Sequence, residues 1–148
     1  MKDLDWSNLS FGYRQTDYNV RCYYRNGKWG EIEVCSDEYL KLHMAATCLH
    51  YGQEAFEGLK AYRCPDGKVR VFRMDENAAR LQSTCRGIMM PEVPTEMFEE
   101  MVKKVVRLNQ EWIPTYESGA TLYIRPLLIG TSAQVGVHPA TELSLIHI

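Results

Sequence analysis

Five arginines lie on or beside runs of residues that favour strands or a helix, and their side chains are the groups best suited to chemistry with anions. A guanidinium presents a rigid fork of N–H donors that can hold a carboxylate or a phosphate through two parallel hydrogen bonds. The sequence contains no glycine-rich loop of the form G-x-x-x-x-G-K-[ST] and no G-x-S-x-G nucleophile elbow. The residues alone therefore indicate candidate anion sites without fixing a reaction. The five are Arg63, Arg70, Arg73, Arg80 and Arg125.

Neither the cysteines nor the histidines are spaced as metal ligands. The 5 cysteines are odd in number and form no C-x-x-C pair, so we expect reduced and mostly packed thiols. The 4 histidines form no H-E-x-x-H motif and have no neighbouring carboxylate cluster. We therefore predict no metal site.

Composition is typical of one soluble globular domain. Of the 148 residues, 45% are hydrophobic and 24% are charged, which is enough apolar material for a core. The formal net charge of −2 offers no basic excess for a nucleic-acid backbone, so we expect no nucleic-acid partner. No apolar run reaches the roughly 18 residues of a membrane helix, and the first ten residues lack the apolar stretch of a signal peptide. We expect a cytoplasmic protein with no membrane segment.

The elements that must position the arginines begin with two predicted hairpins. Extended runs at 18–24 and 28–34 flank Asn26-Gly27, which is a strong two-residue turn signal. A second pair of runs, 58–64 and 68–73, flanks Pro65-Asp66-Gly67. Between the hairpins the pattern predicts a helix over about 45–56.

Two further helices and one strand follow. Asp75 is a plausible N-cap for a helix to about residue 89, and a second, amphipathic helix starts at Thr95. The run 121–130 alternates as a strand, which directs Leu122 and Ile124 to one side and Tyr123 and Arg125 to the other. The chain is thus predicted to be of the α+β class.

The residue pattern leaves the role of the strand arginine open. Arg125 fits an ordinary solvated or salt-bridged arginine as well as a ligand-binding one. The aromatic residues Tyr51, Phe56 and Tyr123 fit a plain core as well as an apolar pocket.

Three blocks resemble the branched-chain amino acid aminotransferases, which are pyridoxal-phosphate enzymes of fold type IV. They are LHYGQEAFEGLKAYR at 49–63, VRVFRMDENAARL at 69–81 and LYIRPLLIGTSAQVGV at 122–137. The segment FGYRQTDYNV is similar to the F-G-x-x-x-T-D motif of that family. The resemblance runs from about residue 11 to residue 142 and concerns the smaller, N-terminal domain, so it implies an antiparallel or mixed sheet with packed helices.

The resemblance implies a role for eight residues of this chain. Arg80, in R-x-D-x-N-x-x-R, matches the arginine that holds the phosphate of pyridoxal 5'-phosphate. Tyr123 and Arg125 match a pair in which the arginine binds the distal carboxylate of glutamate or 2-oxoglutarate. The remaining positions match an apolar substrate pocket for the side chains of leucine, isoleucine and valine, and a substrate-binding loop that reaches across to the active site of the second subunit in a homodimer. The pocket residues are Phe11, Tyr51 and Phe56, and the loop residues are Val135 and Val137.

The resemblance also implies that the catalytic group lies outside this chain. In the family the Schiff-base lysine belongs to the larger C-terminal domain, and Lys60 does not stand in its motif. We therefore expect the 148-residue chain to be inactive alone, and the complete transaminase to use branched-chain amino acids and 2-oxoglutarate in amino-acid biosynthesis. We expect the domain to comprise residues 1–142. LSLIHI at 143–148 matches the translation of a sequencing adaptor, so we expect a non-native tail, with a genuine terminal strand as the alternative.

Two other functions remain open from the sequence. One is another fold type IV enzyme, either a D-amino acid aminotransferase or an aminodeoxychorismate lyase. The F-E-G-L-K-A-Y and L-Y-I-R-P blocks favour the branched-chain group over these. The other is a non-catalytic binding module that uses an exposed apolar face.

Overall fold

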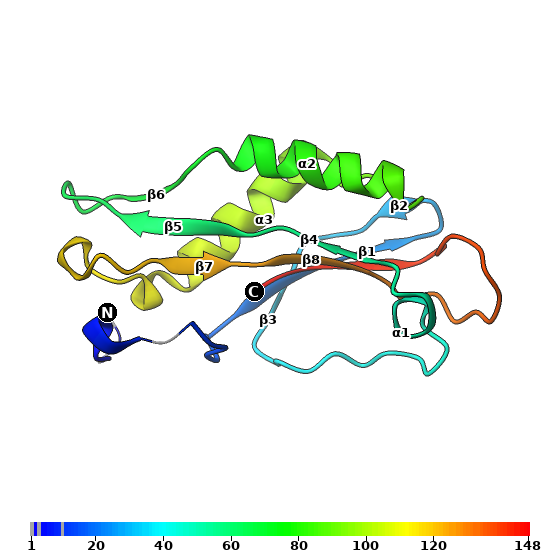
Figure 1. Ribbon diagram of the computed structural model, residues 1–148, viewed down its shortest axis with the longest axis horizontal. Helices are drawn as coiled ribbons and strands as arrows, with labels where there is room; N and C mark the ends of the chain where they lie inside the picture. The colour runs from blue at the N-terminus through cyan, green and yellow to red at the C-terminus, as the bar shows by residue number, and fades with distance from the viewer. Residues whose placement is uncertain (1, 3, 10) are drawn as a thin grey trace.

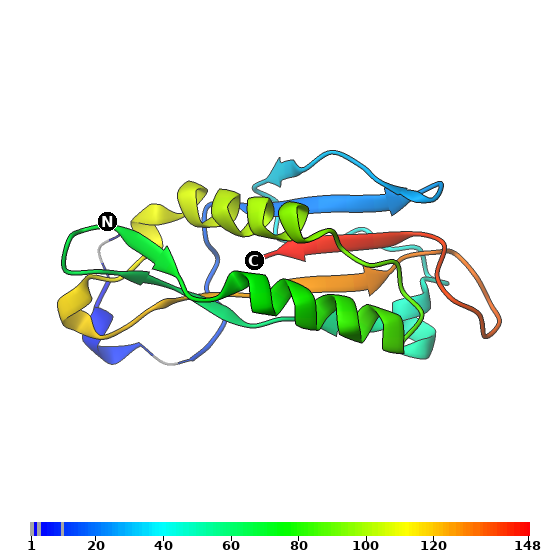
Figure 2. The same cartoon turned by 90° about the horizontal axis from the view of Figure 1, so that it is seen from above.

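Two antiparallel sheets with a pair of helices lying along one side form the chain in the computed structural model, as Figures 1 and 2 show. The structure describes residues 2, 4–9 and 11–148. The larger sheet has the order β2-β1-β9-β8-β4, with β3 also paired to β1, and the smaller has the order β6-β5-β7. Every pairing between these strands is antiparallel, so the predicted α+β class with an antiparallel sheet is confirmed. The large-sheet strands are β1 (Asn19–Arg25), β2 (Lys28–Trp29), β3 (Glu33–Cys35), β4 (Glu54–Phe56), β8 (Pro126–Gly130) and β9 (Leu143–His147). The small-sheet strands are β5 (Leu59–Arg63), β6 (Val69–Val71) and β7 (Leu122–Ile124).

The first predicted hairpin is confirmed at its turn and is shorter than expected afterwards. Asn26 and Gly27 both have positive φ, 52° and 77°, which is the backbone of a type I′ turn. Tyr24 pairs with Trp29 across that turn. The predicted second strand breaks after Trp29, and β3 pairs instead with the start of β1.

The predicted helix over 45–56 is wrong in its second half. Helix α1 spans only Thr47–Tyr51 and ends at Gly52, whose φ of 60° is left-handed. The chain then becomes β4, because Glu54–Phe56 finds hydrogen-bonding partners in β8. Tertiary pairing thus overrides the local helical pattern.

Helices α2 (Met74–Gly87) and α3 (Thr95–Leu108) cover one side of the sheets, as Figure 2 shows from above. The predicted face of α2, Ala78, Leu81 and Cys85, is buried, and Phe98 and Val102 of α3 are fully buried. Asp75 is not the N-cap, because α2 already begins at Met74, after a left-handed Arg73. The short 3-10 turns are η1 (Trp6–Asn8), η2 (Gln110–Trp112) and η3 (Tyr116–Ser118).

Residues 143–147 form β9 in the middle of the large sheet. β9 pairs with β1 on one side and with β8 on the other, and all of its residues are buried. Each ring nitrogen of His147 lacks a hydrogen-bond partner in the described structure. Burial lowers the pKa of this histidine to about 3, because the charged form is desolvated. Residues 143–147 thus form a strand, which is the alternative expectation for this segment. A non-native origin of residues 143–148 stays a prediction.

Candidate functional site

Two segments of the chain leave one sheet and enter the other at the same level. The first runs from β4 through Glu57 and Gly58 into β5, and the second runs from β7 through Arg125 into β8. Phe56 pairs with Leu127 on the large-sheet side, and the backbone N–H of Glu57 donates to the carbonyl of Pro126 at 2.9 Å. The predicted single strand over 121–130 is therefore two strands in different sheets. We call residues 56–58 and Arg125 the crossover.

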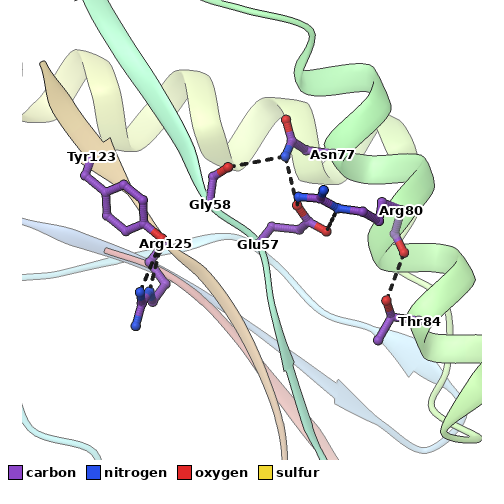
Figure 3. A network of polar contacts seen from close by, with 7 residues as sticks. All are labelled: Glu57, Gly58, Asn77, Arg80, Thr84, Tyr123 and Arg125. Carbon is purple, nitrogen blue, oxygen red and sulfur yellow. Dashed lines mark hydrogen bonds and ion pairs between the residues drawn. The ribbon is translucent and has the colours of Figure 1, made fainter.

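Arg80 of α2 is held by a buried carboxylate of the crossover, as Figure 3 shows. Its Nε and Nη2 atoms donate to the two carboxylate oxygens of Glu57, at 2.9 and 2.6 Å. Asn77, one turn earlier on α2, donates to the same carboxylate at 2.8 Å. The hydrogen bonds from Arg80 to Glu57 and the negative charge of Glu57 raise the pKa of Arg80 above its usual value. The Arg80 side chain is nevertheless 68% exposed, so it is both fixed and accessible.

Arg125 lies against aromatic rings on the side of residues 56–58 that faces away from Arg80. Its guanidinium carbon is 4.7 Å from the ring centre of Phe56 and 5.4 Å from that of Tyr123. Its Nε and Nη2 atoms donate to the Tyr123 hydroxyl at 3.4 and 3.3 Å, which are long hydrogen bonds. Phe11 packs edge-on against Tyr123, with ring centres 5.4 Å apart. The structure thus brings together four of the eight predicted residues, the half-buried Arg125 and the three aromatic residues Phe11, Phe56 and Tyr123.

Tyr51 and the loop containing Val135 and Val137 form a second group. The Tyr51 hydroxyl accepts a hydrogen bond from the backbone N–H of Gly136 at 2.7 Å. Val135 and Val137 flank that glycine and are 88% and 91% exposed. Figure 1 shows α1 and the 131–142 loop at the same end of the molecule. This group is joined through Tyr51 and is not linked by those contacts to the crossover.

The other three candidate arginines have backbone or surface partners away from the crossover. Arg63 donates to the carbonyls of Gln110 and Ile113. Arg70 forms a two-pronged ion pair with Asp66 in the turn of the second hairpin. Arg73 pairs with Asp75 and Glu76 at the start of α2. Arg80 and Arg125 remain the candidates for ligand binding.

Sequence reasoning missed Glu57, Asn77 and Gly58. A Cβ atom on Gly58 would lie 2.6 Å from the Tyr123 hydroxyl, so only glycine lets Tyr123 approach this closely. The signal available was a lone carboxylate inside the apolar run Ala55–Leu59, together with Asn77 three residues before Arg80 on one helix face. Neither feature shows which arginine the carboxylate binds.

Within the described residues, no helix has the length and apolar character needed to cross a membrane. The five cysteines are free, and Cys22 and Cys85 are buried.

The paired antiparallel sheets with α2 and α3 on one side are the small-domain fold of the fold type IV aminotransferases. The crystal structure of the Escherichia coli branched-chain amino acid aminotransferase matches 89% of this chain with a TM-score of 0.68 and 27% identity, over 38% of its own length. A second branched-chain amino acid aminotransferase (T.th.), whose crystal structure contains pyridoxamine 5'-phosphate, matches 84% of the chain with a TM-score of 0.59 and 26% identity, over 38% of its own length.

The relatives found by sequence are also branched-chain aminotransferases. The branched-chain-amino-acid aminotransferase of Haemophilus influenzae is 51% identical over 96% of this chain, and that of Helicobacter pylori is 45% identical over 99%. No protein-family model matches. The chain is thus homologous, in sequence and in fold, to a segment of the branched-chain aminotransferases. It spans 41% and 43% of the length of these two relatives.

Proposed function

We propose that this chain is the small domain of a branched-chain aminotransferase and that Arg80 binds the phosphate of pyridoxal 5'-phosphate. The exposed guanidinium supports this role, since it retains N–H donors beyond those bound to Glu57. A phosphate dianion matches such a group in charge and in geometry. When bound, the cofactor supplies the electron sink and the amino-group carrier that transamination requires. The residues of this chain would bind the cofactor and the substrate and orient them.

The substrate pocket is then lined by Phe11, Phe56, Tyr123 and Arg125 at the crossover. Tyr51 would complete it from the separate group at the end of α1. The aromatic faces accept the apolar side chain of leucine, isoleucine or valine and exclude water. The same pocket must accept the distal carboxylate of glutamate or 2-oxoglutarate. Arg125 suits this second task because its long hydrogen bonds to the Tyr123 hydroxyl leave its donors free to turn toward a carboxylate.

Val135 and Val137 are proposed to reach across to the active site of the second subunit in a homodimer, where they would contact the substrate. Burial of these two valines, which are about 90% exposed, would contribute to the free energy of association. The hydrogen bond from Gly136 to the Tyr51 hydroxyl fixes the loop that carries them. Association would then place these valines without a change in the loop.

The observation that carries the proposal is the crossover. Three consecutive residues connect the two candidate arginines: Phe56 contacts Arg125, Glu57 binds Arg80, and Gly58 admits Tyr123. A cofactor phosphate and a substrate carboxylate must lie at a fixed separation during transfer. A single backbone segment that holds both arginines meets this requirement.

A chimaera tests the proposal. Residues 1–142, which we propose to be the domain, would replace the matching segment of the Haemophilus influenzae relative, and transamination of leucine, isoleucine and valine with 2-oxoglutarate would be measured. We expect activity with all three amino acids, loss of cofactor retention in Arg80→Ala, and selective loss of the 2-oxoglutarate half-reaction in Arg125→Leu. Arg70→Leu, which removes an exposed pair in a hairpin turn, is the control and should retain both activities.

The alternatives predict other outcomes. A folded chimaera that binds pyridoxal phosphate and processes D-amino acids or aminodeoxychorismate, with no branched-chain activity, would favour another fold type IV enzyme. A folded chimaera with no cofactor binding would favour a non-catalytic module and reject the role of Arg80.

A further inference from the structure

Glu57 is a nearly fully buried carboxylate whose side-chain partners both come from helix α2. Its side chain is 3% exposed, whereas that of Arg80 is 68% exposed. Both oxygens accept from Arg80, and one also accepts from Asn77. Asn77 also donates to the carbonyl of Gly58 at 3.4 Å. The carboxylate is therefore fixed by two residues of one helix, and one of them is itself tied to the crossover.

The two-pronged geometry fixes more than a simple charge contact would. Two parallel N–H···O bonds define the plane of the guanidinium as well as its position. Among the described residues, Nη1 of Arg80 has no hydrogen bond, and it lies on the edge of the fork away from the Nε–Nη2 pair. The donors that remain for a ligand are thus presented in one direction by a side chain that would otherwise have many rotamers.

Glu57 also places a negative charge next to the proposed anion site. A carboxylate next to an anion-binding arginine repels the anion, and burying it costs desolvation energy. Orientation of Arg80 acts against both effects, because an arginine that is already ordered loses little side-chain entropy on binding.

We propose that Glu57, held by Asn77, is a positioning residue that orders the guanidinium of Arg80 for an incoming phosphate. The inference rests on the proposed phosphate-binding role of Arg80. It adds a residue that contacts no ligand and sets the direction of one that does.

The test is nuclear magnetic resonance on the 148-residue chain. The Nε–Hε signal of Arg80, assigned by its loss in Arg80→Lys, reports the hydrogen bond to Glu57. Titration with sodium phosphate against sodium chloride at equal ionic strength reports anion binding. We expect a slowly exchanging Nε–Hε signal that shifts on addition of phosphate and not of chloride.

The decisive variant is Glu57→Asp, which keeps the charge and withdraws the carboxylate by one methylene. Because repulsion of the anion is retained and orientation is lost, we expect rapid exchange of the Nε–Hε proton. The dissociation constant for phosphate should rise about tenfold, which corresponds to about 1.4 kcal/mol. Glu76→Asp alters the exposed Arg73–Glu76 pair on the same helix. It is the matched control and should change neither readout.

Each outcome bears on a separate claim. Arg80→Ala with unchanged phosphate affinity, or a wild-type signal insensitive to phosphate, would reject the anion site and the inference with it. Weakened binding in Arg80→Ala with wild-type behaviour in Glu57→Asp would leave the anion site standing and overturn the positioning role. If Glu57→Asp does not fold, Asn77→Ala decides: a weaker phosphate affinity, by about two- to fivefold, with faster exchange supports the inference, and no change refutes it.

Discussion

Replacing His147 with leucine should stabilise the chain and remove much of its sensitivity to mild acid. The His147 side chain is 0% exposed, its ring centre lies 5.3 Å from that of Phe98, and neither ring nitrogen is hydrogen-bonded in the described structure. A buried polar group without a partner costs about 1 to 3 kcal/mol. Leucine has a similar volume and no polar atom, so we expect the free energy of unfolding to rise by about 2 kcal/mol at neutral pH.

The pH dependence follows from the lowered pKa. The folded chain keeps His147 neutral down to about pH 3, whereas the unfolded chain protonates it near 6.5. The titration of His147 therefore leaves the free energy of unfolding unchanged above about pH 6.5 and lowers it steadily as the pH drops toward 3. A pH of about 5 lies about one and a half pH units below 6.5. Protonation of His147 in the unfolded chain therefore lowers the free energy of unfolding by about 2 kcal/mol at this pH, at about 1.4 kcal/mol per unit.

Urea unfolding at about pH 7.5 and about pH 5 measures both effects. Carboxylates also titrate in this range, so the quantity of interest is the difference between wild type and His147→Leu. The exposed histidine replacement His138→Leu is the control and should keep the wild-type pH dependence. Equal loss of stability in wild type and His147→Leu between the two pH values would show that His147 is not buried and that β9 does not occupy the middle of the sheet.

Three further changes test the packing. Gly130→Ala should lower the free energy of unfolding by about 2 kcal/mol, because the added Cβ would lie 2.2 Å from Thr47 Oγ1 and 3.0 Å from the Ala140 Cβ; an unchanged urea midpoint would contradict this. Phe98→Ala should cost about 3 to 5 kcal/mol, since this fully buried ring joins α3 to the large sheet, and calorimetry would measure the loss. Iodoacetamide at about pH 8 should modify Cys35 and Cys64 well before Cys85, because burial raises the pKa of Cys85 to about 11. Mass spectrometry would detect the order of labelling. Early labelling of Cys85 would mean that the buried face of α2 is accessible to solvent.

The sequence predicts the local parts of this fold and misses the parts that depend on distant partners. The Asn26-Gly27 turn and the buried face of α2 follow from local backbone preference and helical period, and both are confirmed. The helix over 45–56 fails because β8, which is distant in the sequence, pairs with Glu54–Phe56. The strand over 121–130 fails at Arg125 because two sheets share one alternating run.

The same limit applies to the candidate site. Residue type and resemblance identify Arg80 and Arg125 as candidates, and the structure leaves the first exposed and the second half-buried. Their separate environments depend on Glu57 and Phe56, each of which is distant in the sequence from the arginine that it contacts. No local pattern reports such pairing, because one contact joins the two segments that pass between the sheets and the other joins the crossover to helix α2.

The crossover also restricts where the length of this chain can change. Phe56, the last residue of β4, and Glu57, which follows it, point to opposite sides of the chain, so a single inserted or deleted residue before them would exchange their sides. The aromatic ring would then face α2, and the carboxylate would face Arg125. Related chains should therefore keep a constant length from β4 through β5 and from β7 through β8, while variation in length should gather in the hairpin turn at 64–68 and in the segment between α3 and β7.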